Sequence, residues 1–218
     1  MSGGDVARRV AALYPSRFLR MYVRWKIASD PVYEAVFARA RGPITDLGCG
    51  AGVLAAYLRA RGFDAPIVGI DHDARKIAVA RGLGLRNTTF ELDHVGPAKA
   101  RPDGLKPILH TVVMLDLLHY LDDDARSALL QSLTSADLVI IRDAVRDGSW
   151  RYRATYAQET FARAVRWLQA DRLNFPRRAT IAGAFEGFES EIDPLWGRTP
   201  FNNYLFVFRR VSSGMTKR

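Results

Sequence analysis

The stretch Ile44–Leu54 constrains the fold of this chain more than any other part of its sequence. It reads Ile-Thr-Asp-Leu-Gly-Cys-Gly-Ala-Gly-Val-Leu, an apolar run with one acid followed by glycines at alternate positions and a helix-like segment. Glycine permits the positive φ angles of a tight turn and lets a ligand approach the backbone closely. A helix that begins at such a turn presents free N–H groups and a partial positive charge. The stretch therefore predicts a strand, a glycine loop and a helix, with a ligand on the loop.

From Ile44 onward, short apolar runs alternate with helical patterns, which is typical of a parallel sheet covered on both faces. The last two runs are joined by a short loop and favour an antiparallel hairpin at the sheet edge. We therefore expect an α/β fold, a doubly wound seven-stranded mostly parallel sheet with a C-terminal antiparallel hairpin and a helical N-terminal preface. The expected strands are 44–47, 67–70, 88–92, 108–115, 138–141, 185–193 and 203–210.

Acids follow most of the predicted parallel strands, which is more than chance would give. Ligands of such sheets bind beyond the carboxyl ends of the strands, where the strand order reverses. The alternative is that some of these acids only cap the next helix, as we expect of Asp73 and Asp122. The strand-end residues are Gly48, Asp71, Asp93, Asp116 and Asp143.

Composition narrows the possible partners. The net charge is +9, and a basic surface attracts nucleic acid, anionic lipid, an acidic carrier protein or an anionic metabolite. A merely solubilising arginine-rich surface explains the scattered charges equally well. A single cysteine, Cys49, excludes an internal disulfide and a multi-cysteine metal site, and we expect no metal. No apolar run approaches the ~20 residues of a membrane span, and the N-terminus lacks a signal-peptide pattern, so we expect a cytoplasmic protein.

The glycine loop departs from the dinucleotide fingerprint Gly-x-Gly-x-x-Gly, because position 53 is valine and the third glycine is Gly52. The run Asp46–Gly52 closely resembles motif I of the class I S-adenosylmethionine-dependent methyltransferases. The resemblance continues at Asp71 and Asp93, where these enzymes place acids for the ribose hydroxyls and the adenine amino group. It also covers 112–121, which resembles the family's fourth-strand motif and following loop.

The resemblance implies S-adenosyl-L-methionine as cofactor, and two vicinal hydroxyls do suit one carboxylate such as Asp71. The cofactor carries a cationic sulfur and no phosphate, which suits nearby acids. Cys49 occupies a small-residue slot of the motif, and no neighbouring base is specified that would make it a nucleophile. The expected cofactor-binding residues are Asp46, Gly48, Cys49, Gly50, Gly52, Asp71, His72, Asp93, Asp116 and, for the methionyl carboxylate, Arg24.

His119 follows the fourth strand and is the candidate catalytic residue. A comparable histidine is the general base in some plant-type O-methyltransferases, and an imidazole can take a proton from a hydroxyl or amine. The alternative is a packed structural histidine, because methyl transfer from a sulfonium relies mainly on alignment.

The domain division follows from these assignments. Residues 1–42 form an N-terminal helical lid or preface, and 43–218 form a Rossmann-like methyltransferase domain with a helical insert at about 146–178. Within the insert, 151–170 reads as an amphipathic helix. Its candidate core positions are Tyr156, Phe161, Val165 and Leu168.

The predicted function is methyl transfer, most readily to oxygen, on a small-molecule, lipid-like or carrier-protein-bound acceptor. An RNA methyltransferase is an alternative, although nucleic acid is not favoured because no dense basic run is present. A non-catalytic module that only binds the cofactor is another. A nicotinamide oxidoreductase is disfavoured by Val53.

Overall fold

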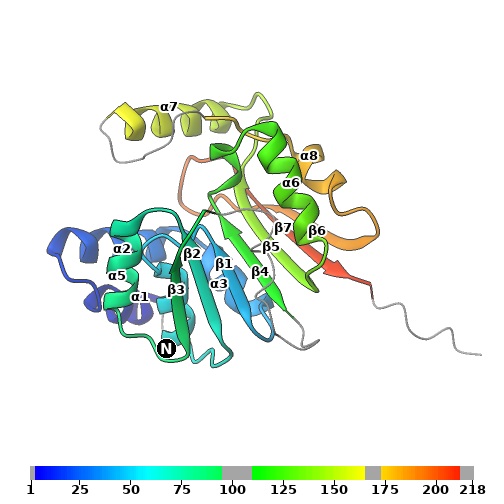
Figure 1. Ribbon diagram of the computed structural model, residues 1–218. Coiled ribbons are helices and arrows are strands. Elements are labelled where there is room, and N and C mark those ends of the chain that lie inside the picture. The colour runs from blue at the N-terminus through cyan, green and yellow to red at the C-terminus, as the bar shows by residue number, and fades with distance from the viewer. Residues whose placement is uncertain (1–2, 95–109, 165–172, 212–218) are drawn as a thin grey trace, which may run out of the picture.

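The computed structural model describes residues 3–94, 110–164 and 173–211 of the chain. These residues form a seven-stranded sheet with helices on both faces (Figure 1). The strand order is β3-β2-β1-β4-β5-β7-β6. The strands are β1 (Ile44–Leu47), β2 (Ile67–Asp71), β3 (Thr88–Leu92), β4 (Thr111–Leu115), β5 (Leu138–Ala144), β6 (Phe188–Pro194) and β7 (Asn203–Arg210).

The strand directions confirm the predicted fold class. Neighbouring strands from β3 to β5 are parallel, and β7 is antiparallel to both β5 and β6. The chain first moves outward from β1 to β3 and then returns to the other side of β1 with β4. This reversal beside β1 is the switch point at which a doubly wound sheet opens a crevice for a ligand.

Side chains alternate along each strand and so build a core on each face. Val113 and Ile140 face one core, whereas Met114 and Ile141 face the other. The first core is completed by α1 (Gly3–Ala12), α2 (Arg17–Ser29), α3 (Val32–Arg39), α4 (Val53–Ala60) and α5 (Ala74–Gly82). The second is completed by α6 (Asp123–Leu133) and α8 (Arg178–Gly183) with the turn that follows it.

The helix caps follow the sequence closely. The Asp73 carboxylate accepts from the N–H groups at the start of α5, and Asp122 accepts from Ala125 N at the start of α6, as predicted. The N-cap of α3 is Pro31, which makes no side-chain cap hydrogen bond. Asp30 instead accepts from Val32 N at 3.0 Å and turns its other oxygen toward the sheet.

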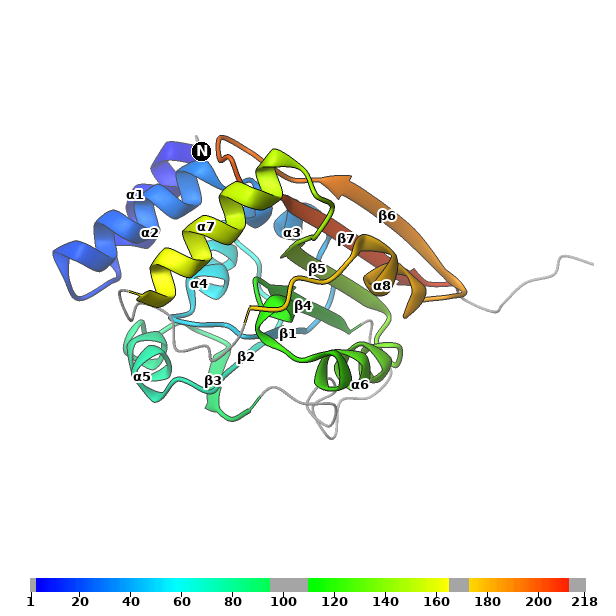
Figure 2. The same cartoon turned by 90° about the horizontal axis from the view of Figure 1, so that it is seen from above.

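Helix α7 (Trp150–Ala164) crosses above the carboxyl ends of the parallel strands (Figures 1 and 2). Tyr156 is 49% exposed and Phe161 is 69% exposed, so their prediction as core residues is wrong. The helix rests on loops rather than on a sheet face, and a narrow strip around the buried Thr155 makes the contact. Val165 and Leu168 lie outside the described residues.

Other boundaries differ modestly from the prediction. The fourth strand begins at Thr111, and positions 108 and 109 of the predicted strand are outside the described residues. β6 begins at Phe188 because Phe185 turns into the core, where its ring stacks on Phe208 at 4.0 Å. The six-residue α8 is too short to show a helical period in the sequence and was not predicted.

Gly69 in β2 leaves space that its neighbours fill. It lies between Asp46 of β1 and Phe90 of β3 in the sheet register. A Cβ at Gly69 would lie 2.7 Å from Phe90 Cδ1 and 2.9 Å from Cys49 Sγ. The missing side chain therefore lets Phe90 and Cys49 support the glycine loop from below.

We expect Gly69→Ala to lower the free energy of unfolding by about 1–3 kcal/mol, the usual cost of overpacking. The measurement is urea denaturation followed by circular dichroism. Gly183→Ala is the matched control, because a Cβ there would meet nothing within 4 Å. Equal unfolding midpoints for the two variants would contradict this packing account.

Candidate active site

The glycine loop between β1 and α4 is held to the end of β2. Gly48 N and Cys49 N donate to Ile70 O at 2.8 and 3.0 Å, and Gly50 N donates to Asp71 Oδ2 at 2.8 Å. Gly48, Gly50 and Gly52 have φ angles of +76°, +56° and +75°, a conformation that favours glycine. A Cβ at Gly52 would strike Phe90 at 2.9 Å, whereas one at Gly50 would meet nothing within 4 Å. The loop is thus packed against Phe90 at Gly52 and open at Gly50.

Asp71 is buried at the end of β2 and joins two turns. Its Oδ2 accepts from Gly50 N, and its Oδ1 accepts from Asp73 N at 2.8 Å, with His72 Nδ1 at 3.6 Å. A carboxylate offers about four lone-pair positions, so both oxygens retain acceptor capacity. The arrangement can receive two neighbouring hydroxyl groups at the open side of the loop.

Asp46 lies beneath the loop and is 3% exposed. Its Oδ2 has no hydrogen-bond partner among the described residues. Burial, with a further contribution from the Asp71 charge, raises the pKa of Asp46 to about 7. A cation near Asp46 would remove much of this electrostatic cost, so the position suits a positively charged ligand group.

Cys49 serves packing. Its side chain is buried against Gly69, and burial raises the pKa of the thiol well above its usual range. The sulfur donates only weakly, to Gly50 O at 3.7 Å. A neutral, buried thiol is a poor nucleophile.

Asp93 follows β3 and lies beside Asp71. Its N–H donates to Asp71 O at 3.1 Å, and its Oδ1 accepts from His94 N at 2.7 Å. The rings of His72 and His94 stack with centroids 6.1 Å apart. Asp71, His72 and Asp93 are therefore brought together at one rim of the loop.

Asp116 is held by cations of the protein itself. Its oxygens pair with Arg142 of β5 and, at 3.7 Å, with Lys26 of α2. Burial opposes ionisation of Asp116, but the charges of Arg142 and Lys26, with His119, keep its pKa below the usual value. Arg142 also donates to Asp30 Oδ2 at 2.6 Å, which ties α2 to the strand ends.

The position of Arg24 does not support its predicted role at the strand ends. Arg24 is exposed on α2, whereas Lys26 of the same helix reaches Asp116. The structure therefore adds Lys26 and Arg142, which sequence reasoning missed. Arg142 stands next to a predicted strand-end acid, and a buried arginine in an apolar strand was a usable signal.

His119 and Asp143 form a buried pair at the ends of β4 and β5. Asp143 Oδ1 lies 2.6 Å from His119 Nδ1, and its Oδ2 accepts from Leu117 N and Leu118 N at 3.1 and 2.7 Å. A carboxylate only accepts, so Nδ1 carries the proton and Nε2 has the lone pair in the neutral ring. Nε2 is buried and has no partner among the described residues. Burial opposes the charged ring, but the Asp143 carboxylate raises the pKa of His119 above its ordinary value.

Aromatic rings surround His119. The Phe175 ring stacks on it with centroids 5.0 Å apart, and the Tyr120 ring lies at 4.0 Å. Tyr120 Oη donates to Glu159 Oε2 of α7 at 3.1 Å. A Cβ at Gly48 would lie 3.3 Å from Leu117 Cδ1, so the glycine loop and the His119 segment are in contact.

The next two findings apply to residues 3–94, 110–164 and 173–211, the part of the chain that the structure describes. No cluster of three or more His, Cys, Asp or Glu residues there could hold a metal ion. No helix there is both long and apolar enough to cross a lipid bilayer.

Residues 44–136 match the family model described as a methyltransferase domain. Among curated protein sequences, none matches this chain. The family model covers β1 to the end of α6, and with it the glycine loop, Asp71, Asp93, Asp116 and His119, but not Asp143. This part of the chain is thus similar to a methyltransferase domain, the family that the sequence motifs resemble.

Solved structures share the fold over nearly the whole chain. Magnesium protoporphyrin IX methyltransferase from Synechocystis PCC 6803 has a TM-score of 0.61 at 20% identity, over 96% of this chain and 94% of that one. An O-methyltransferase family protein from Burkholderia thailandensis has a TM-score of 0.61 at 17% identity, over 94% and 63%. Human N-acetylserotonin methyltransferase has a TM-score of 0.58 at 15% identity, over 96% and 56%. The fold is that of class I methyltransferases.

The raised pKa of Asp46 predicts a pH-dependent stability. The folded chain keeps this proton up to about pH 7, whereas the unfolded chain releases it near 3.8, so wild-type stability falls as pH rises between these values. Asp46→Asn removes that loss. From about pH 5 to about pH 8, we expect the variant to gain about 2–3 kcal/mol relative to wild type, at about 1.4 kcal/mol per pKa unit.

The measurement is the free energy of unfolding in urea at each pH, without added ligand. Asp64→Asn, at a carboxylate that is 67% exposed, serves as the control. A difference from wild type that stays constant with pH for both variants would refute the buried-carboxylate account.

Proposed function

We propose that this class I methyltransferase domain transfers the methyl group of S-adenosylmethionine to an oxygen of a small or carrier-bound acceptor. The observation that carries the proposal is the buried His119–Asp143 pair. The Nε2 atom of His119 has no partner among the described residues, and the His119 segment touches the glycine loop. One of the structures with the same fold is an O-methyltransferase family protein, which supports the reaction class.

The residues of the loop fit this cofactor. The Synechocystis and human structures contain S-adenosylhomocysteine and S-adenosylmethionine respectively. In this chain, Asp71 would accept from the ribose hydroxyls, and the open side of Gly50 leaves room for the ligand. The unpartnered Asp46 Oδ2 is a favourable neighbour for the cofactor's positive charge. Gly48, Cys49 and Gly52 shape the loop, and His72 with Asp93 would border the adenine.

The basic side chains of the proposed site have separate roles. Lys26 and Arg142 already neutralise Asp116, so Asp116 would position α2 and the strand ends rather than carry the cofactor's charge alone. Arg24 would contact the methionyl carboxylate of the cofactor only if α2 shifted when ligands bind.

His119 is the proposed general base. When bound, the cofactor would supply a methyl group on a cationic sulfur, and the methyl–sulfur bond would break to leave a neutral thioether. His119 Nε2 would take the proton of the acceptor hydroxyl as its oxygen forms the new O–C bond, and the Asp143 carboxylate would stabilise the resulting imidazolium. Nε2 is buried and the rings of Phe175 and Tyr120 pack on His119, so an acceptor can reach Nε2 only if a neighbouring side chain moves.

Asp71→Asn tests the ribose assignment. We expect affinity for S-adenosylmethionine, measured by isothermal titration calorimetry, to fall about tenfold to 100-fold, because a charge-assisted hydrogen bond contributes roughly 1.5–3 kcal/mol. Asp122→Asn is the matched control, since Asp122 also accepts a backbone N–H but caps α6. Unchanged affinity in Asp71→Asn would remove Asp71 from the cofactor site.

His119→Asn tests the base. We expect turnover with labelled S-adenosylmethionine and a cell extract as acceptor pool to fall about 100-fold or more, with unchanged cofactor affinity. In the wild type, the rate should rise with pH through a pKa above the ordinary histidine value, because Asp143 favours the charged ring. His110→Asn is the control, a buried histidine at the opposite end of β4. Full turnover in His119→Asn would leave His119 a packing residue, and binding without any transfer by wild type would favour a non-catalytic module.

A further inference from the structure

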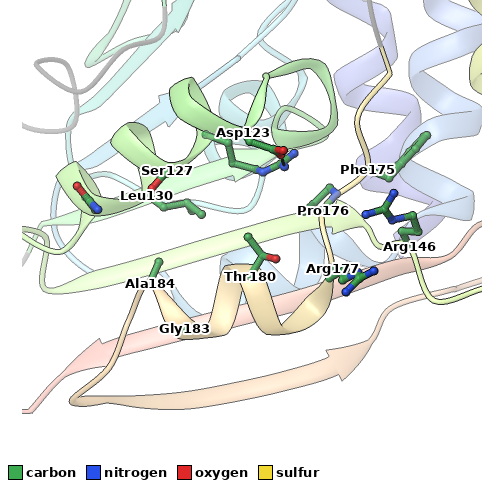
Figure 3. A pocket seen from close by; sticks show the side chains of 12 residues that line it. Asp123, Ser127, Leu130, Arg146, Phe175, Pro176, Arg177, Thr180, Gly183 and Ala184 are labelled. Atoms are coloured by element: carbon green, nitrogen blue, oxygen red, sulfur yellow. Dashed lines mark hydrogen bonds and ion pairs between the residues drawn. The ribbon is translucent and has the colours of Figure 1, made fainter.

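A pocket separate from the glycine loop opens between α6 and α8, on the second face of the sheet (Figure 3). Its volume is about 520 Å³. Leu130 and Ala184 provide apolar wall, while Ser127, Gln131 and Thr180 bring side-chain hydrogen-bond donors. Such a pocket accommodates a ligand with an apolar body and a polar end.

Arginines dominate the charge of this pocket. Arg126, Arg146 and Arg177 line it together with one acid, Asp123, which pairs with Arg126. Within residues 3–94, 110–164 and 173–211, neither Arg146 nor Arg177 forms an ion pair, and both are exposed. Figure 3 shows these two side chains at the same end of the pocket, beside Phe175. Two unneutralised guanidinium groups on one cavity favour an anion there.

Arg126 adds a buried donor. Arg126 is 4% exposed, and its Nε has no hydrogen-bond partner among the described residues. Its terminal nitrogens are used by Asp123 and by Asn174 O, the latter at 2.7 Å. The guanidinium is therefore fixed in place while one N–H remains unused, which is costly unless a ligand or water accepts from it.

The pocket borders the proposed catalytic histidine. Phe175 lines the pocket and stacks on the His119 ring, with centroids 5.0 Å apart. Asn174 N donates to His119 O at 2.7 Å. The Phe175 ring thus lies between the pocket and His119.

We propose that this arginine pocket binds the anionic group, a phosphate or carboxylate, of the methyl acceptor. The inference rests on the proposed function and names the acceptor class for it. Arg146 and Arg177 bind the oxyanion at the mouth of the pocket, and displacement of Phe175 brings the acceptor hydroxyl to His119 Nε2. The net charge of +9 is consistent with attraction of such an acceptor.

The first experiment measures anion binding without any methyl transfer. Inorganic phosphate is titrated into the full chain at constant ionic strength, balanced with sodium chloride, and the melting temperature is followed by differential scanning fluorimetry. The pocket variant is Arg146→Ala/Arg177→Ala. The control is Arg153→Ala/Arg178→Ala, which removes the same charge from exposed arginines that do not line the pocket.

We expect a saturable rise in melting temperature for wild type and control, and about tenfold or more weaker binding for the pocket variant. Arg146→Lys/Arg177→Lys keeps the charge but loses bidentate binding, so its affinity should be intermediate. The lysine variant also tests the proposal if the alanine variant does not fold. Identical titrations for pocket variants and control, or no saturable rise in wild type, would overturn the proposal.

The second experiment identifies the acceptor. A cell extract is separated into lipid and aqueous fractions, each divided by anion exchange, and incubated with labelled S-adenosylmethionine. We expect label from wild type and control in an anionic fraction, with at least about tenfold less from the pocket variant. Label only in uncharged fractions would overturn the acceptor assignment. If wild type labels nothing, the proposed function fails, while the phosphate titration still decides whether the pocket binds anions.

Discussion

The glycine loop depends on three backbone N–H groups that donate to the end of β2. Gly48 and Cys49 share Ile70 O, and Gly50 reaches Asp71. Packing fixes the same loop from below, because Phe90 occupies the space that side chains at Gly52 and Gly69 would need. Tyr14 from the N-terminal helices donates to Ala51 O at 3.1 Å, so the preface is joined to the loop as well. The buried Asp46 beneath the loop then makes the site electrostatically receptive to a cation.

The other half of the site depends on two consecutive residues of β5 that point to opposite faces. Arg142 joins Asp30 and Asp116, and so holds the N-terminal helices against the strand ends. Asp143 collects Leu117 N, Leu118 N and the His119 ring. Removing one partner of such a buried charge network usually costs several kcal/mol, whereas the complete network mainly specifies geometry. β5 therefore positions the N-terminal helices on one side and the candidate base on the other.

Local patterns predicted what local interactions determine. The glycine loop, the Asp73 and Asp122 caps and most strands follow from spacing over a few residues. The predictions failed where tertiary contacts decide. Helix α7 rests on loops, which leaves Phe161 exposed, and the pairing of Lys26 with Asp116 was missed because it depends on how α2 packs. The arginine pocket joins residues from α6, the end of β5 and α8, and no single stretch of sequence contains its pattern.

On the proposed function, the glycine loop binds a sulfonium cofactor rather than a dinucleotide. Isothermal titration calorimetry of the wild-type chain with S-adenosylmethionine, and separately with NADH, tests this claim most directly. The account predicts saturable one-site binding of S-adenosylmethionine and no heat of binding with NADH. Binding of NADH at this site, or no binding of S-adenosylmethionine to folded protein, would contradict it.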